Sequence, residues 1–324
     1  MVIEKNIENI IKQNYDKKYH LEEKITVFML VLINILILMF SDYSVTTGIF
    51  ILNILIITCI AVTPHIQRTL EHEWFDLFRD WYVYIIIGLI YMQYVRLVPF
   101  INPHEVDNII IRIDKFLFLG NHPTLLLEQI TYPVITEILQ VVYASFSLMP
   151  AIICLLLYID GRKVTFHIVL SLIMIGFYSS YIGYYIAPAI GPRFTLAHLQ
   201  NLELRGILTY DFISSTLNYF EGVKDGVYAH DCCPSGHTLI AILVAALSFR
   251  YRKSIFHIIL PWSLLLIFST VYLRYHYVLD LIAGAAVAAI IIRFAPRYVE
   301  RVVIHDNVEK IPDPAKESFI YTKN

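Results

Sequence analysis

Apolar residues along the chain are gathered into eight segments that polar stretches separate. The segments lie at residues 25–41, 45–63, 82–100, 134–158, 164–187, 235–250, 255–272 and 277–295. Several are close to the ~20 residues that an α-helix needs to cross a hydrocarbon core about 30 Å thick. A segment in lipid has to satisfy its backbone hydrogen bonds internally, and a helix does so. The pattern therefore predicts an all-α fold, a polytopic membrane bundle of about eight transmembrane helices.

Two of the polar stretches carry aromatic and apolar residues between their charges at approximately helical spacing. They are residues 64–81 and 105–119. An amphipathic helix that lies in the membrane interface shows this pattern. We expect both stretches to be interfacial helices; solvated loops with a few apolar residues are the alternative.

The composition agrees with a membrane protein. Of the 324 residues, 57% are hydrophobic and 16% are charged, with a mean hydropathy of +0.62, whereas a soluble domain has about 25% charged residues. The net charge of −2 argues neither for nor against a nucleic-acid partner. For a membrane-embedded chain we expect membrane lipids as partners and no nucleic acid. The adjacent Cys232 and Cys233 lack the spacing of zinc ligands, and we expect no disulfide framework.

Lys and Arg are distributed unevenly over the loops of this bundle. If the N-terminus lies inside, 18 of the 25 basic residues fall on the inner side and 7 on the outer side. Cytoplasmic loops carry the excess of Lys and Arg in membrane proteins. The sequence therefore predicts that both termini are cytoplasmic. Residues 1–24 precede the first apolar segment and no small-residue cleavage site follows it, so we expect an uncleaved anchor.

Three short polar clusters fall on one side of this threaded bundle. GPR at 191–193 follows the fifth apolar segment, PSGH at 234–237 opens the sixth, and RYHYVLD at 274–280 joins the seventh to the eighth. With both termini inside, all three clusters lie at the outer surface of the membrane. Their convergence predicts a functional site at that face.

The PSGH cluster has the chemistry of an anion site at the start of a helix. Pro234 suits the first helical turn because its missing N–H costs nothing there. Ser235 and Gly236 place backbone N–H groups at the positive end of the helix dipole, where a phosphate oxygen binds. His237 follows in the same turn and would face the same ligand. A helix start with an incidental histidine is the structural alternative.

The RYHYVLD cluster contains a candidate nucleophile. His276 and Asp280 are four residues apart, a spacing that places two side chains on one face of a helix. The carboxylate would accept a hydrogen bond from one imidazole nitrogen and leave the other as a nucleophile. Arg193 and Arg274 offer guanidinium groups that match phosphate oxygens. The structural alternatives are a helix-capping His–Asp pair and arginines that snorkel to the membrane interface.

These motifs resemble the three signatures of the type 2 phosphatidic acid phosphatase superfamily, over about residues 193–284. That superfamily includes lipid phosphate phosphatases, inositol phosphorylceramide synthase-like transferases and vanadium-dependent haloperoxidases. The resemblance implies a six-helix phosphatase-type core. It also implies a phosphoric ester hydrolase or phosphotransferase that needs no metal and no cofactor.

The resemblance implies a role for each candidate site residue. His276 attacks phosphorus and forms a phosphohistidine intermediate, Asp280 orients His276, and His237 protonates the leaving oxygen. The residues implied to hold the phosphate oxygens are Arg193, Arg274 and the backbone of Ser235 and Gly236.

Two positions depart from the phosphatase pattern. Ile186 stands where the first signature has Lys, and Thr270 stands where the third has Arg. Arg274, beside the nucleophile, would compensate for the missing cation. Such departures occur in the inositol phosphorylceramide synthase-like branch, which residues 114–124 also resemble. We therefore place the chain nearest to that branch.

The predicted function is that of a membrane lipid-phosphate phosphatase or phosphotransferase whose substrate is a lipid phosphate or diphosphate. An inositol phosphorylceramide synthase-like head-group transferase, with an acceptor alcohol as second substrate, is the alternative. A haloperoxidase and a non-enzymatic membrane transporter or lipid-binding protein are further alternatives. We divide the chain into an N-terminal part with three transmembrane helices (1–133), a catalytic membrane core (134–296) and a cytoplasmic tail (297–324).

Overall fold

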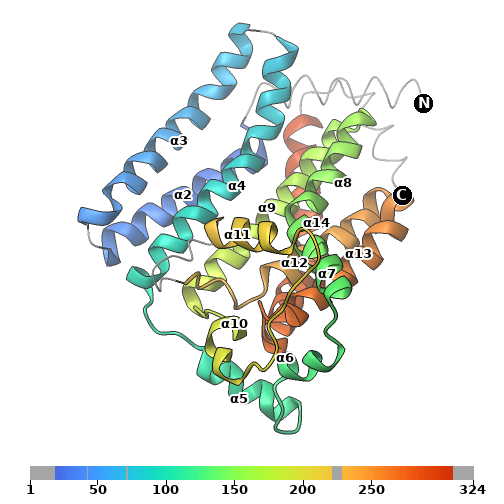
Figure 1. Cartoon of the computed structure of the whole chain (residues 1–324). Helices are drawn as coiled ribbons and strands as arrows, with labels where there is room; N and C mark the ends of the chain where they lie inside the picture. The colour runs from blue at the N-terminus through green and yellow to red at the C-terminus, as the bar shows by residue number, and fades with distance from the viewer. Residues whose placement is uncertain (1–18, 42, 71, 221–227, 309–324) are drawn as a thin grey trace.

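A computed structural model describes residues 19–41, 43–70, 72–220 and 228–308 of the chain (Figure 1). These residues form helices and no strand, apart from one isolated bridge between Ala189 and Asp231. The predicted all-α, polytopic membrane bundle is confirmed.

Seven helical stretches within the described residues are long and apolar enough to cross a membrane. They are α2 (Leu21–Phe40), α3 (Tyr43–Leu70), α4 (Glu73–Ile101), α7 (Pro133–Ala144) with α8 (Leu148–Ile159), α9 (Lys163–Ile186), α13 (Lys253–Tyr272) and α14 (Val278–Val308). An eighth helix, α12 (Gly236–Tyr251), is apolar but has only 16 residues. Because α14 continues to Val308, the first part of the predicted tail is helical, and residues 309–324 lie outside the described residues.

The bundle is built around α9. In its most apolar window, 78% of the residues are buried, against 22–44% in the other six spans. A helix that is apolar around its whole circumference is buried inside a bundle, and α9 packs against α2, α4, α8, α12 and α14. The helices α2, α3 and α4 form a unit on one side of the molecule, drawn in blue to cyan in Figure 1, while α12 packs against both α13 and α14.

The prediction of an interfacial helix over residues 64–81 is wrong. Residues up to Leu70 continue α3, and α4 begins at Glu73. The charged side chain that suggested a surface position, Arg79, is 1% exposed and forms a 3.0 Å ion pair with Glu23. The polar pattern of this stretch therefore reflects pairing between helices inside the bundle.

The predicted helix within residues 105–119 is present as α5 (Asp107–Leu117). Its two buried carboxylates, Asp107 and Asp114, point toward the bundle, whereas Ile109 and Phe116 on its other face are 59% and 83% exposed. An apolar exposed face is what a membrane surface would cover, and the interfacial position stays a prediction.

The long polar connections between the spans, after α4 and after α9, gather at one end of the bundle. Helix α5 lies there beside two short helices, α6 (Pro123–Leu126) and α10 (Pro192–Thr195), at the lower end of Figure 1. The same connections contain α11 (Tyr210–Phe220) and two short 3-10 helices, η1 (Leu127–Ile130) and η3 (Ala197–Leu199). A third 3-10 helix, η2 (Ser145–Ser147), joins α7 to α8 within one span.

The start of α12 is packed tightly against α14 through Gly284. A Cβ atom added at Gly284 would lie 2.4 Å from the backbone oxygen of Ser235. The Ser235 oxygen belongs to the backbone, so it cannot move aside as the flexible end of a side chain could. The absence of a side chain at 284 thus allows the PSGH segment to sit where it does.

We therefore expect Gly284→Ala to destabilise the protein, because overpacking of this kind typically costs about 1–3 kcal/mol. The measurement is thermal unfolding of the purified protein in detergent. Gly48→Ala on α3 is the control, since a Cβ atom there meets nothing within 4 Å. Equal melting temperatures for Gly284→Ala and wild type would contradict the proposed close packing.

Candidate active site

His276 is directed into the bundle by a tight turn after α13. Arg274 in this turn has a φ of +64°, and the backbone N–H groups of Tyr275 and His276 both donate to the carbonyl of Thr270, at 2.9 and 3.1 Å. The imidazole Nδ1 lies 2.9 Å from the carbonyl oxygen of Cys232. Because a carbonyl only accepts, Nδ1 carries the proton in this hydrogen bond. The unprotonated ring nitrogen of His276, whose lone pair is free to act as a nucleophile, is therefore Nε2.

His237 meets His276 from a different element. It lies in the first turn of α12, where the Ser235 side chain caps the helix by accepting from the Thr238 N–H at 3.2 Å. Its Nδ1 is 3.3 Å from Nε2 of His276. The ring is stacked on Tyr143, with ring centroids 4.4 Å apart. Two histidines that are 39 positions apart in the sequence thus converge on one point.

Asp280 lies beside His276 but does not make the predicted hydrogen bond to it. Its Oδ2 is 3.6 Å from Nδ1 of His276, which is longer than a hydrogen bond. Oδ2 instead accepts from the Cys232 thiol at 2.8 Å and from the Tyr277 N–H at 2.9 Å. The tautomer of His276 is fixed by the Cys232 carbonyl, and the Asp280 carboxylate contributes a buried negative charge close to the ring.

Arg193 borders a small hollow beside His276. Its guanidinium donates to Asn218 at 3.0 Å and lies 5.3 Å from the centre of the Tyr275 ring. The hollow has a volume of about 20 Å³, enough for about one water molecule. A phosphoryl group needs more space, so Arg193, Phe194 or Tyr275, which line the hollow, has to move before a substrate can enter.

The groups predicted to cradle phosphate at the start of α12 are used within the protein. The Ser235 N–H donates to the backbone carbonyl of Asp280 at 3.0 Å, and its hydroxyl caps the helix. A Cβ atom at Gly236 would lie 2.3 Å from the Tyr184 hydroxyl. Gly236 therefore allows α12 to approach α9 closely.

Arg274 is held away from the histidines. Its guanidinium donates to Gln200 Oε1 at 2.9 Å, to Glu128 Oε1 at 2.8 Å and to the Leu202 carbonyl at 2.8 Å, and the residue is 4% exposed. The left-handed turn at this residue sends its side chain away from the ring of His276. This arrangement does not support the predicted compensation for a missing cation, and it gives Arg274 the role of joining η1 to the loop around residues 200–202.

Two carboxylates on α5 support the site, and the sequence reasoning missed them. Asp107 accepts from the N–H groups of Ile190 and Gly191, each at 3.0 Å, and from the Tyr277 hydroxyl at 2.8 Å. Asp114 accepts from two N–H groups at the start of α14, each at 2.9 Å. Carboxylates seven residues apart lie on one face of a helix, so the spacing could have indicated a buried acidic face.

Cys232 is the third site residue that the sequence reasoning missed. Its sulfur, His276 and Asp280 offer ligand atoms within 4.8 Å of one another, a grouping that could hold a metal ion. In the structure these atoms take part in hydrogen bonds instead: the thiol donates to Asp280, and Nδ1 of His276 donates to the Cys232 carbonyl. Burial, reinforced by the Asp280 carboxylate, raises the pKa of the Cys232 thiol well above its usual range. The thiol thus stays protonated and donates a hydrogen bond to Asp280.

A large apolar cavity adjoins the histidine pair. Its volume is about 460 Å³. It is lined by α4, α7, η2 and α9, with Tyr84, Tyr91, Phe146 and Tyr181 among its walls, and it reaches His237. At its polar end the Tyr91 hydroxyl donates to Asp231 at 2.7 Å. The site therefore has a polar hollow on the His276 side and an apolar chamber on the His237 side.

The fold and the site are those of a polytopic membrane protein with two converging histidines at one end of its helical bundle. Comparison with known families identifies its family. The family model described as PAP2 superfamily matches residues 108–294, which is more than half of the chain. The chain belongs to the PAP2 superfamily. Neither a curated protein nor a solved structure matches it.

Membership in this superfamily supports a phosphatase or phosphotransferase that acts on lipid phosphates, because its members are generally phosphoesterases. The match begins in α5 and ends in α14. The unit formed by α2, α3 and α4 lies outside it, although α4 walls the apolar cavity.

We expect Cys232→Ala to lower kcat by roughly tenfold or more, since hydrogen bonds to charged groups contribute about 1.5–3 kcal/mol. Cys232→Ser, which keeps a donor for Asp280, should recover most of the activity. Steady-state kinetics with a lipid phosphate provides the measurement, and Cys154→Ala, a buried cysteine of α8, is the control. If the serine variant is as impaired as the alanine variant, the hydrogen bond is not what matters at this position.

Proposed function

We propose that this protein is a membrane lipid-phosphate phosphatase or phosphotransferase that acts through a phosphohistidine on His276. The observation that carries the proposal is the 3.3 Å approach of His276 Nε2 to His237 Nδ1, at the junction of a polar hollow and an apolar cavity. A nucleophile and a proton donor are thereby placed at one point, with a cation on one side and room for a lipid chain on the other.

The proposed reaction has two steps. Nε2 of His276 attacks phosphorus, the bond from phosphorus to the lipid oxygen breaks, and His237 gives its proton to that oxygen. Water or an acceptor alcohol then attacks the phosphohistidine, returns a proton to His237 and releases His276. Arg193 would hold oxygens of the phosphoryl group, as a guanidinium does in a two-pronged contact. These residues supply the nucleophile, the general acid and the positive charge, so the proposed reaction needs no metal ion.

The apolar cavity is the proposed place of the lipid chain. His237 lines it, and His237 is the proposed proton donor to the leaving oxygen. The leaving group of the first step would therefore be a lipid alcohol that remains in the cavity. A pocket of this volume with few polar groups is typical of sites for apolar ligands.

The alternative, an inositol phosphorylceramide synthase-like head-group transferase, is favoured by the charge around His276. Of the two predicted arginines, Arg193 alone borders the hollow, because Arg274 is bound to Glu128. Arg205 is paired with Glu203 at 2.6 Å on the surface, and Lys224 lies outside the described residues. A phosphodiester carries one negative charge and a phosphomonoester up to two, so a single cation suits a diester better.

We expect purified protein to cleave at least one member of a panel of lipid phosphates, lipid diphosphates and phosphodiester lipids. His276→Gln should lower kcat by more than about a hundredfold, because no neighbouring group can replace the nucleophile. His198→Gln, an exposed histidine near the same end of the bundle, is the control.

The same panel, incubated with and without a long-chain alcohol, separates the two forms of the proposal. Free phosphate or free head group in the absence of alcohol indicates a hydrolase. Product formed only with the alcohol indicates a transferase. A protein that binds these lipids and converts none of them would be the transporter or lipid-binding alternative, and the proposal would fall.

We further propose that both termini are cytoplasmic and that the active site faces the outer side of the membrane. The excess of Lys and Arg in the loops opposite the site supports this orientation. We expect a cysteine at Asn201 to react with a membrane-impermeant maleimide on intact cells. A cysteine at Ser254 should react only after permeabilisation, with the parent protein as background. The reverse pattern would place the active site in the cytoplasm.

A further inference from the structure

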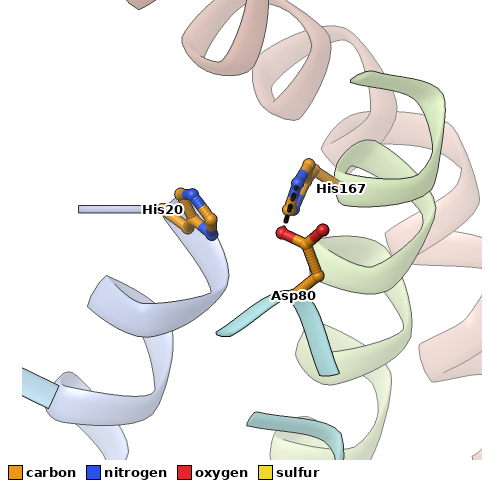
Figure 2. A group of neighbouring side chains, drawn as sticks. All are labelled: His20, Asp80 and His167. Atoms are coloured by element: carbon orange, nitrogen blue, oxygen red, sulfur yellow. Dashed lines mark ion pairs between the residues drawn. The ribbon is translucent and has the colours of Figure 1, made fainter. Parts of the chain in front are cut away.

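A second group of polar side chains is buried at the opposite end of the bundle from the histidine pair. His20 precedes α2, Asp80 lies on α4 and His167 lies on α9, and Figure 2 shows the three side chains facing one another. They are 0%, 1% and 2% exposed. His167 is 17 residues before Tyr184, which contacts the start of α12, or about 26 Å along a helix with a rise of 1.5 Å per residue. The group is therefore separate from the proposed active site.

Buried charged side chains surround this group. The carboxylates are Glu22, Glu23 and Asp80, and the permanent cations are Arg79 and Lys163. Arg79 pairs with Glu23, and Lys163 pairs with Asp80 at 2.9 Å. The third carboxylate, Glu22, meets Nδ1 of His167. A buried carboxylate needs a partner that carries a proton or a positive charge.

The contacts of His167 distinguish a protonated imidazole from an imidazole that binds a metal ion. Its Nδ1 is 2.5 Å from Glu22 Oε1, and its Nε2 is 3.4 Å from Asp80 Oδ1. A protonated imidazole would hold Asp80 at about 2.7–2.9 Å, as charge-assisted hydrogen bonds do. Two ligands of a tetrahedral zinc ion, with bonds of about 2.0–2.1 Å, lie about 3.3 Å apart. The longer distance fits a pair of metal ligands.

The neighbours of these two side chains are those of a metal site. A histidine that binds a metal through one nitrogen commonly donates from the other nitrogen to a carboxylate, and Glu22 occupies that place. Lys163 holds Oδ2 of Asp80 and leaves Oδ1 directed at His167. His20 supplies a third candidate ligand, with its ring centroid 4.6 Å from that of His167.

We propose that His20, Asp80 and His167 form a binding site for a divalent transition-metal ion of the zinc class. The three candidate ligand atoms lie within 4.8 Å of one another, so binding would draw them together by about 1.5 Å at most, to the ~3.3 Å of a zinc site. Two imidazoles and a carboxylate are a ligand set that suits zinc.

The position of the site indicates what the ion would do. Two ligands come from the part of the chain that precedes the family match, and the third comes from α9 inside it. The ion would join the unit of α2, α3 and α4 to the central helix of the bundle. Its role is therefore structural, and the proposal does not depend on the reaction at His276.

We expect the full-length protein, purified in detergent and equilibrated with micromolar Zn²⁺, to retain about one zinc per chain by elemental analysis. His20→Gln and His167→Gln should each lower the zinc content at least tenfold. Glu22→Gln should weaken zinc affinity about 10–100-fold, as the loss of a carboxylate partner does. His65→Gln, an exposed histidine on α3, is the control and should bind as wild type does.

Removal of zinc with a chelator should lower the melting temperature of the wild type, and added Zn²⁺ should restore it, because an ion bound to the native state alone stabilises that state. Wild type that holds less than about 0.1 zinc per chain would overturn the proposal and leave an ion-pair cluster. Zinc content unchanged in His20→Gln would also overturn it. The first of these results is independent of whether the variants fold.

Discussion

Hydrocarbon offers no hydrogen bonds, so every polar group inside this bundle needs a partner within the protein. Two dense polar clusters satisfy that constraint, one at each end of α9. At one end, the carboxylates of Asp280, Asp107 and Asp114 accept from backbone N–H groups and side-chain donors. At the other, Glu23 and Asp80 pair with Arg79 and Lys163. The apolar length of the helix between these ends holds the two clusters apart.

The constraint explains how the loops around the histidine pair are fixed. The loop after α9 and the start of α14 carry backbone donors that no helix satisfies, because first-turn N–H groups have no partner within their own helix. Helix α5 provides both partners, Asp107 for the first and Asp114 for the second. The family match begins at residue 108, in the same helix. An amphipathic helix therefore serves as a brace for the histidine pair.

The N-terminal unit is outside the family match, yet it contributes to the chamber beside His237. Tyr84 and Tyr91 of α4 wall the apolar cavity, and Tyr91 donates to Asp231 next to the site. In the proposed reaction, residues inside the family match supply the chemistry, and α4, which precedes the match, walls the cavity proposed for the lipid chain. The same unit meets α9 again at the buried cluster of His20, Asp80 and His167.

The sequence alone determined the helical membrane class, the approximate positions of the spans and the presence of His237 and His276 at the same end of the bundle, because hydrophobic length and the order of the spans can be read along the chain. It did not determine how residues 64–81 are arranged, since Arg79 is buried only through its pairing with Glu23, 56 positions away. Tertiary structure also decided that Cys232, not Asp280, holds the ring of His276, and that Arg274 faces Glu128. Each of these outcomes depends on a partner distant in the chain, and the pattern of neighbouring residues holds no information about that partner.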